Sequence, residues 1–377
     1  MKLRNLFTKP AKSAAVQTAY KMNMPVGLSA VPLMPPDAMM LRSMRAAVPI
    51  IDAAINKIVR LTGGFSVECS SDEQSEALGA FLARVRVGAS GEGIQAFLAA
   101  YLDQLLMYGT AVGEMLISTD GEDIAALYNA DLNDLAFSGS TPLEVKVCVR
   151  EAGGVKPAPY QQLIVHTALD PEPGSVRGRS LLGGLPFVTE ILTKIYSCIG
   201  VNFERMGNLR YAVTYRPNGD SVDRINAKQR ATQIAEQWSD AMKSKEVRDF
   251  VAVGDVDIKV IGAESQMLST EVPVRQMLEQ IVAKTGIPPF LLGLSWSSTE
   301  RMSAQQADIL TSELDYYRSL LTPVVRRICD MWLRLHGESG EVRVNWEPIN
   351  LQDEISLAQA RLYRAQAMQI EASLKGE

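Results

Sequence analysis

The sequence predicts an α+β fold, and three observations support this. Apolar residues recur at helical spacing over residues 49–62, 72–108 and much of 185–335. Short alternating runs typical of strands gather between residues 111 and 166. The chain has 377 residues, of which 47% are apolar and 21% charged. That length and composition suffice for a sizeable core in one large domain or two to three ordinary ones.

The first half predicts three helices followed by strands. A helix begins at Pro49, a residue suited to a first helical turn, and stops at Gly63 and Gly64. An alternating run over 65–69 predicts a strand, and helices are expected over 72–86 and 92–108. Further strand-like runs lie at residues 111–118, 124–128, 143–149 and 162–166, with turns expected at 129–134 and 153–159.

The second half predicts a long helix over 185–206 and a compact mixed section after it. That section contains a strand at 211–215, a polar helix over 226–245 and strands at 249–253 and 256–261. Residues 273–284 again show one apolar stripe at helical spacing. A short strand at 342–346 and a largely polar helix over 353–374 complete the chain.

The segment Thr-Gly-Ile-Pro-Pro-Phe-Leu-Leu-Gly over residues 285–293 divides two helices. Gly286 suits a helix C-terminus that needs positive φ, and Pro288 and Pro289 forbid continuation. A long helix is expected from about residue 300, and Pro323 should kink or restart it. The chain therefore predicts helix, stiff proline corner, short apolar loop and long helix.

This order of elements resembles the portal proteins of tailed bacteriophages of the HK97-like kind. Three further segments carry the resemblance in the same order. Residues 106–113, Leu-Met-Tyr-Gly-Thr-Ala-Val-Gly, are similar to the place where a helix gives way to a wing strand. A histidine, His166, is followed by a Gly-x-Ser-x-Leu stretch over 178–182, and residues 310–335 resemble the long helix after the loop. The similarity covers roughly residues 40–340.

The resemblance implies a portal-type fold with a mixed α/β wing, two long stem helices, a small α/β clip and a long kinked helix after a tunnel loop. The expected boundaries follow the chain. They are a flexible N-terminal arm at 1–40, the wing at 41–182, stem helix 1 at 183–207, the clip at 208–265, stem helix 2 at 266–287, the tunnel loop at 288–300, the kinked wing helix and strand at 301–349, and a short crown or C-terminal helix at 350–377.

By the same resemblance, the chain is expected to form a ring, usually of 12 subunits, at one capsid vertex. The expected partners are other copies, double-stranded DNA passing without sequence specificity, the terminase large subunit, a head–tail adaptor, and major capsid protein or scaffold. The tunnel loop would line the DNA channel with Pro288, Pro289, Phe290, Leu291, Leu292, Leu294, Ser295, Trp296, Ser297, Ser298 and Thr299. Partner docking is expected in the clip at Lys243, Lys245 and Glu246. A competing interpretation buries the apolar loop in the subunit's own core.

Motifs for catalysis are lacking, so no enzyme, cofactor or metal site is predicted. There is no Gly-x-x-x-x-Gly-Lys-[Ser/Thr] loop, no His-Glu-x-x-His and no Gly-x-Ser-x-Gly elbow. A soluble hydrolase using His166 with Asp170 and Ser175 is the alternative from another class. A triad needs a base held against a nucleophile and an oxyanion hole, so a structural His166 is favoured. Arg177 and Arg179 suit phosphate or, preferably, acids of a neighbouring subunit.

Net charge and hydropathy limit what the protein can bind and where it can reside. A net charge of −5 argues against tight phosphate binding but is compatible with a wall that DNA must slide past. A membrane channel built on residues 181–203 is disfavoured, because Glu190 and Lys194 would lie near the bilayer centre. The four cysteines are widely spaced and are expected to be free thiols. The expected location is the virion, and the host cytoplasm during assembly.

Overall fold

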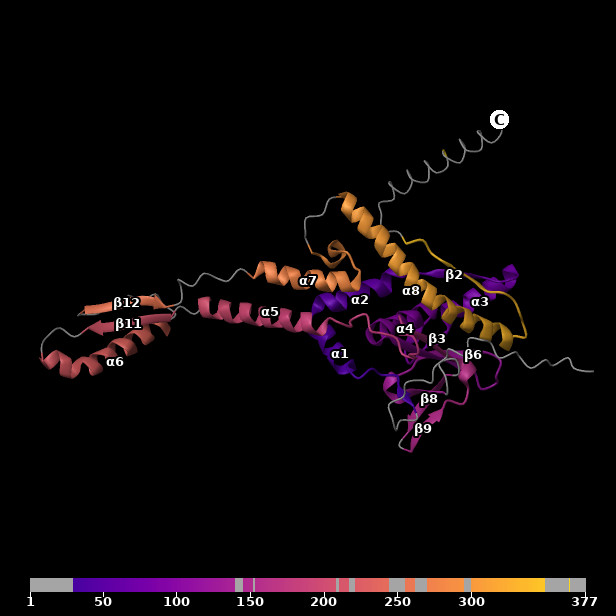
Figure 1. The fold of residues 1–377 in the computed structure, drawn as a ribbon, viewed down its shortest axis with the longest axis horizontal. Helices are drawn as coiled ribbons and strands as arrows, with labels where there is room; N and C mark the ends of the chain where they lie inside the picture. Colours follow the sequence, from indigo (N-terminus) through magenta and orange to yellow (C-terminus); the bar gives the residue numbers. More distant parts are fainter. Residues whose placement is uncertain are drawn as a thin grey trace, which may run out of the picture. The chain divides into compact units, whose positions relative to one another are not determined.

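The computed structural model describes residues 30–139, 145–151, 153–207, 210–216, 221–243, 255–261, 270–294 and 300–349, together with the helical residue Gln366 (Figure 1). The chain divides into two compact units. One comprises residues 1–189 and 278–377, and the other comprises residues 190–277. The second unit is thus an insertion in the first.

Helices of the first unit begin and end where local chemistry requires. The helices are α1 (Ala38–Ala47), α2 (Pro49–Leu61), α3 (Asp72–Arg84), α4 (Ile94–Tyr108) and α8 (Glu300–Leu335). The Ser71 side chain caps α3 by accepting from the Gln74 N–H at 3.2 Å. Gly109 ends α4 with φ 75°, a conformation that favours glycine. The predicted helices in 49–62, 72–86 and 92–108 are confirmed.

Three sheets accompany these helices. The five-stranded sheet has the order β10 (Ile164–Ala168), β5 (Thr110–Ile117), β6 (Ile124–Asn129), β3 (Arg86–Val87) and β4 (Gly91–Glu92). The four-stranded sheet has the order β1 (Val31–Pro32), β7 (Leu135–Ser138), β8 (Lys146–Glu151) and β9 (Gly154–Pro157). A third sheet pairs β2 (Phe65–Glu68) with β13 (Arg343–Trp346). All pairs in these sheets are antiparallel except β3 with β6, which is parallel.

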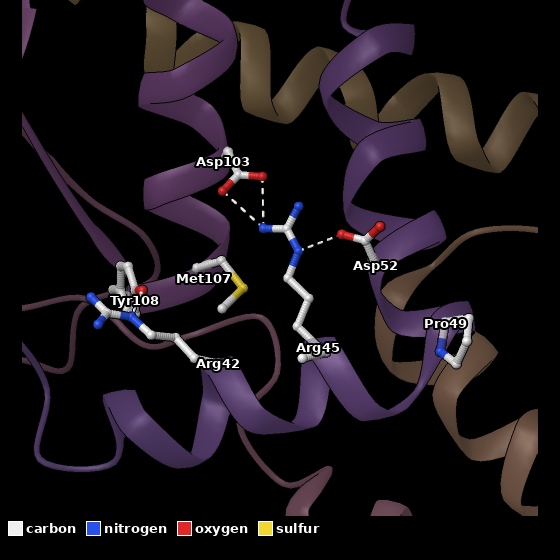
Figure 2. A pocket seen from close by; sticks show the side chains of 8 residues that line it. Arg42, Arg45, Pro49, Asp52, Asp103, Met107 and Tyr108 are labelled. Carbon is white, nitrogen blue, oxygen red and sulfur yellow. Dashed lines mark hydrogen bonds and ion pairs between the residues drawn. The ribbon is translucent and has the colours of Figure 1, made fainter.

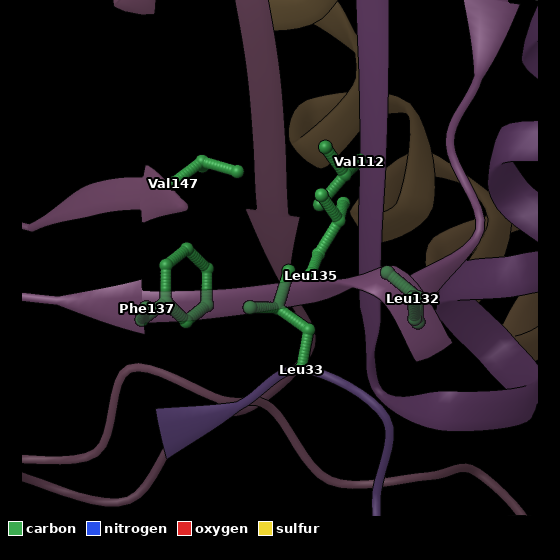
Figure 3. Packing of buried hydrophobic residues seen from close by; sticks show 6 residues of the cluster. All are labelled: Leu33, Val112, Leu132, Leu135, Phe137 and Val147. Carbon is green, nitrogen blue, oxygen red and sulfur yellow. The ribbon is translucent and has the colours of Figure 1, made fainter. Parts of the chain in front are cut away.

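Hydrophobic packing joins the two larger sheets. Figure 3 shows a cluster contributed by β1, β5, β7, β8 and the segments beside them. Its members are Leu33, Val112, Leu132, Leu135, Phe137 and Val147. Leu33 and Phe137 are fully buried, so the segment before α1 is part of the core of the first unit. Burial of a side chain of this size stabilises the fold by about 1.5–3 kcal/mol.

Three sequence expectations need correction here. The predicted flexible arm over 1–40 is too long, because Val31 and Pro32 pair with β7 and α1 begins at Ala38. Residues 1–29 lie outside the described residues. The turn expected at 153–159 contains strand β9, whose Gly and Pro residues are tolerated because β9 is an edge strand. Strand β7 was not predicted from the sequence. It directly follows the turn expected at 129–134, and its antiparallel pairing with β1 and β8 identifies it as a strand.

The inserted unit contains the mixed section predicted from the sequence. Strands β11 (Arg210–Arg216) and β12 (Asp255–Ile261) pair antiparallel over seven residues each, and α6 (Ser221–Lys243) packs on β11. The predicted strands at 211–215 and 256–261 are confirmed, whereas the strand expected at 249–253 lies outside the described residues. Helices α5 (Pro186–Gly207) and α7 (Glu271–Thr285) lead into and out of this unit.

Helix α8 passes through Pro323 without restarting. It is one helix of 36 residues with the proline inside it. Proline removes one backbone hydrogen bond from the helix. Side chains beside it make hydrogen bonds that stabilise this turn. Thr322 Oγ1 donates to the Arg318 carbonyl at 2.7 Å and accepts from Trp346 Nε1 at 2.9 Å. Arg318 lies over the Trp346 ring at 5.3 Å and donates from Nε to the Thr62 carbonyl at 2.8 Å.

Candidate functional site

The proline corner begins where α7 ends. The Gly286 N–H donates to the Val282 carbonyl at 2.9 Å, and Gly286 has φ 70°. An L side chain at that φ would be strained, so glycine suits this position. Pro288 follows with extended backbone, φ −55° and ψ 141°. The helix stop predicted at Gly286 is therefore confirmed.

A single 3-10 turn, η4 (Pro289–Leu292), lies in the described part of the segment predicted to be a tunnel loop. The Leu291 N–H donates to the Pro288 carbonyl and the Leu294 N–H to the Pro289 carbonyl, each at 3.0 Å. Gly293 closes the turn with φ 75°. Because η4 contacts α2, the loop is a structured corner seated on the first unit.

Exposure differs along this corner. Pro288 is buried, whereas Pro289, Leu291, Leu292 and Leu294 are half-buried. Phe290 is 40% exposed. The remaining predicted channel residues, Ser295, Trp296, Ser297, Ser298 and Thr299, lie outside the described residues. The base is thus anchored in its own subunit, as the buried-loop interpretation expects, while Phe290 at the tip is accessible.

Two motifs singled out in the sequence meet in the structure. Gly109 ends α4, and its carbonyl accepts from the Leu169 N–H at 2.8 Å. The Leu169 carbonyl in turn accepts from the Arg179 N–H at 2.7 Å. An added Cβ at Gly178 would lie 2.0 Å from the Gly109 oxygen. The Tyr-Gly motif and the Gly-x-Ser-x-Leu motif therefore form one close backbone crossing.

The serine and leucine of the second motif extend this crossing. Ser180 Oγ donates to the Met107 carbonyl at 2.7 Å and accepts from the Leu182 N–H at 3.1 Å. The Leu181 N–H donates to the Leu106 carbonyl at 2.9 Å. These contacts satisfy carbonyl groups in the last turn of α4. The crossing fixes the chain just before α5.

The two arginines around Gly178 bind their own chain. One guanidinium nitrogen of Arg177 donates to the Pro32 carbonyl at 3.4 Å. Arg179 Nε donates to the Asp170 carbonyl at 3.0 Å, and its guanidinium lies 4.0 Å from the Glu172 carboxylate. Both contacts of Arg179 are largely exposed, so its charge is accessible to a further partner.

His166 does not form a catalytic triad with Asp170 and Ser175. The Asp170 carboxylate accepts from the Tyr316 hydroxyl at 2.5 Å, and Ser175 Oγ donates to the Arg177 carbonyl at 2.8 Å. His166 instead packs edge-on against Phe137, with ring centroids 5.2 Å apart. Desolvation, followed by the positive charge of Arg327, lowers the pKa of His166. The arrangement supports a structural His166.

A polar hollow that the sequence did not indicate lies between α1, α2 and α4 (Figure 2). Its volume is about 500 Å³. Arg45 extends between Asp52 and Asp103, with contacts of 2.6 and 2.8 Å, as the dashed lines in Figure 2 show. Arg42 donates from Nε to the Tyr108 hydroxyl at 2.6 Å. Because Arg45 pairs with both carboxylates and Arg42 bonds to the Tyr108 hydroxyl, the hollow is best explained as a joint between three helices.

Clusters of metal ligands and membrane-spanning helices are both absent from the described residues. Within the described ranges, no group of three or more His, Cys, Asp or Glu side chains could hold a metal ion. None of the described helices is both long and apolar enough to cross a bilayer. Glu190 and Lys194 on α5 pair at 2.6 Å in the i, i+4 order. Burial raises the pKa of the Cys329 thiol to about 12, and the four cysteines are free, as expected.

The predicted docking residues of the clip are only partly described. Lys243 is the last residue of α6. Lys245 and Glu246 lie outside the described residues. Helix α6 is polar, as predicted, and many of the side chains described on it are exposed. The docking role of these three residues stays a prediction.

Comparison with solved structures shows which known architecture this is. No protein-family model and no curated protein matches the chain. A chain of the neck of an empty GTA (gene transfer agent) particle computed with C6 symmetry matches with a TM-score of 0.64 and 15% identity, covering 90% of this chain and 91% of that one. A chain of the native GTA neck with C12 symmetry matches with a TM-score of 0.62, 14% identity and coverage of 90% and 91%.

An HK97 family phage portal protein from Corynebacterium diphtheriae is also similar, with a TM-score of 0.43, 12% identity and coverage of 81% and 95%. The two GTA chains come from the necks of assembled particles. The matches to the GTA neck chains cover nearly the full length of this chain. The predicted mixed α/β fold is thereby confirmed, and the chain shares the fold of these GTA neck chains.

Proposed function

We propose that this chain is a portal subunit, forming a ring of 12 copies at one capsid vertex of a tailed phage or prophage particle. One observation carries the proposal: 90% of the chain shares its fold with chains of symmetric GTA necks. The proline corner with η4 at its base supports it, because helix, corner and long helix occur in the order the portal family uses. The role is structural, with virion and host cytoplasm as its sites.

The exposed apolar surface of α5 supports assembly into a ring. Phe187 is 71% exposed, Tyr196 48%, Val201 45% and Phe203 57%. Apolar surface of this extent on a single helix favours burial against another copy, at about 25 cal/mol per Å². A closed ring buries such heterologous contacts without leaving an open end.

Double-stranded DNA would pass through the ring without sequence recognition. The tunnel loop offers apolar and hydroxyl side chains, and the chain carries a net charge of −5. Neutral contacts release phosphates easily, whereas arginines would hold them. Packaging would be driven by a terminase docked on the clip, which would later seat a head–tail adaptor. Capsid protein or scaffold would contact the wing.

Negative-stain microscopy and light scattering of the purified protein test the ring. We expect rings with a central hole and the mass of an oligomer. Replacing Tyr196 and Phe203 with Glu should weaken assembly, whereas Ser197→Glu with Glu204→Gln on neighbouring exposed positions should leave it intact. A monomer at all protein and salt concentrations would overturn the proposal of an intrinsic ring.

A separate experiment tests the clip. Reversing the charges of Lys243, Lys245 and Glu246 should leave rings intact and weaken binding of terminase or adaptor, measured by pull-down. Charge reversal at Glu190 on α5 serves as the control. Unchanged partner binding in the triple variant would place docking elsewhere.

A further inference from the structure

Asp170 has a left-handed backbone, with φ 43°, and within the described residues it is the only residue other than glycine with positive φ. It lies just beyond strand β10, after the buried Leu169. This conformation is unfavourable for a residue that has a Cβ, although aspartate tolerates it better than most. Backbone strain of this kind persists only where surrounding contacts hold it.

Two parts of the chain that are distant in sequence hold Asp170. The Asp170 carboxylate accepts from the hydroxyl of Tyr316, on α8, at 2.5 Å. The Asp170 carbonyl accepts from Nε of Arg179, in the segment before α5, at 3.0 Å. Asp170 therefore joins α8 to the segment that leads into α5.

The bond to Tyr316 is both strong in kind and open to solvent. Hydrogen bonds from a hydroxyl to a carboxylate are charge-assisted and short. Desolvation, followed by the hydrogen bond to Asp170, raises the pKa of Tyr316 to about 12, so the hydroxyl keeps its proton at neutral pH. Tyr316 is nevertheless 38% exposed, and Asp170 is also exposed. Water can compete for both groups, so this bond can open while the core stays folded.

Helix α8 has a second attachment at the other end of β10. Arg327 donates to the carbonyls of Gln161 and Gln162 at 3.1 and 3.2 Å. These two residues precede β10, whereas Asp170 follows it, and α8 packs on β10 between them. Opening at Asp170 would leave the Arg327 attachment in place, so the change would be confined to one end of the contact.

Conformation alone does not explain an aspartate at residue 170, because glycine would adopt φ 43° without strain. The carboxylate is needed for the bond to Tyr316. Once that bond opens, nothing offsets the strain, and the backbone favours negative φ. Rotation there would move the Asp170 carbonyl away from Arg179. It would also displace Leu169, which bonds to Gly109 and Arg179 in the backbone crossing.

We propose that Asp170, Tyr316 and Arg179 form a conformational latch. The bond to Tyr316 keeps the strained turn closed, and its opening loosens the backbone crossing at Leu169 and Arg179. Movement of α8 is thereby passed to the chain that enters α5. All three residues of the latch belong to the first unit, and the proposal does not depend on ring formation.

Hydrogen–deuterium exchange of the full-length protein tests the latch at the Leu169 and Arg179 amides, which donate within the crossing. Tyr316→Phe removes only the hydroxyl. It should make both amides exchange about tenfold faster, as expected for loss of one hydrogen bond to a charged group. Ser319→Ala is the matched control, because the Ser319 hydroxyl bonds within α8, to the Tyr316 carbonyl at 2.7 Å. This control should leave both amides unchanged.

Asp170→Gly tests whether the effect passes through residue 170. Glycine has no carboxylate and adopts positive φ without strain, so adding Tyr316→Phe to this variant should not change exchange further. Exchange in Tyr316→Phe as slow as in the wild-type protein would overturn the latch. An equal acceleration by Tyr316→Phe in the Asp170→Gly background, or by Ser319→Ala alone, would also overturn it, because α8 would then loosen the crossing by another route.

Discussion

Gly178→Ala is a substitution for which the structure predicts a large loss of stability. The new Cβ would lie 2.0 Å from the Gly109 oxygen, 2.3 Å from the Leu169 nitrogen and 2.4 Å from the Leu169 oxygen. Normal contacts to carbon are more than 3 Å, so two backbone segments must separate by about 1 Å. No flexible side chain is present to absorb that movement.

Separation would break the bonds that join these segments. Leu169 N–H to Gly109 O measures 2.8 Å and Arg179 N–H to Leu169 O measures 2.7 Å, and the Gly178 N–H donates to Thr110 Oγ1 at 3.2 Å. Each buried group left unsatisfied costs about 1–3 kcal/mol. We therefore expect Gly178→Ala to lower the free energy of unfolding by about 4 kcal/mol.

Urea unfolding followed by circular dichroism measures this change as a lower midpoint. Gly200→Ala is the matched control, because Gly200 lies within α5 and its Cβ would meet no heavy atom within 4 Å. That control should be neutral or more stable by about 1 kcal/mol, since Ala favours helix. A Gly178→Ala midpoint equal to that of the wild-type protein would refute the close crossing.

Three further predictions concern the helix joint, the histidine and the loop. Arg45→Met should lower the free energy of unfolding by about 1–3 kcal/mol, because two carboxylates lose their partner, whereas exposed Arg42→Met should change it by less than about 0.5 kcal/mol; equal urea midpoints would contradict this. Since folding lowers the pKa of His166, the folded state favours the neutral ring, so stability should fall as pH drops below about 6.5 toward the folded-state pKa; His166→Gln should remove this dependence in thermal melts, and an unchanged pH profile would disprove it. Arginines at Ser297 and Ser298 should slow DNA packaging in vitro, most at low salt, and wild-type rates at two ionic strengths would mean that the loop does not face DNA.

Local signals account for the features that the sequence predicted well. Pro49 in the first turn correctly predicted the start of α2, and Gly286 correctly predicted the end of α7. In both cases a single residue determines the boundary. The same residues misled at 153–159, where glycine and proline belong to the edge strand β9. Whether such residues make a turn or an edge depends on a partner strand, which local sequence does not reveal.

Long-range contacts were beyond prediction from one sequence. Gly109 and Gly178 were each noticed as parts of motifs, but nothing in their spacing shows that their backbones cross. Arg45 had no visible role because its two carboxylate partners come from α2 and α4. Pro323 was expected to kink or restart its helix, but the helix continues through it, and Trp346 of β13 donates a hydrogen bond to Thr322 in the turn beside it. At the candidate site, the proline corner at residues 286–289 was predictable from the sequence, but the contact of η4 with α2 was not.

The pairing of β2 with β13 has a consequence for how the chain is made. Glu68 pairs with Arg343, so roughly 275 residues separate the two strands along the chain. At synthesis rates of about 5–20 residues per second, β2 waits about 15–55 s on the ribosome for its partner. The inserted unit is complete well before then. We therefore expect residues 190–277 to fold first, and nascent chains that end before residue 343 to present β2 with both edges open to chaperones.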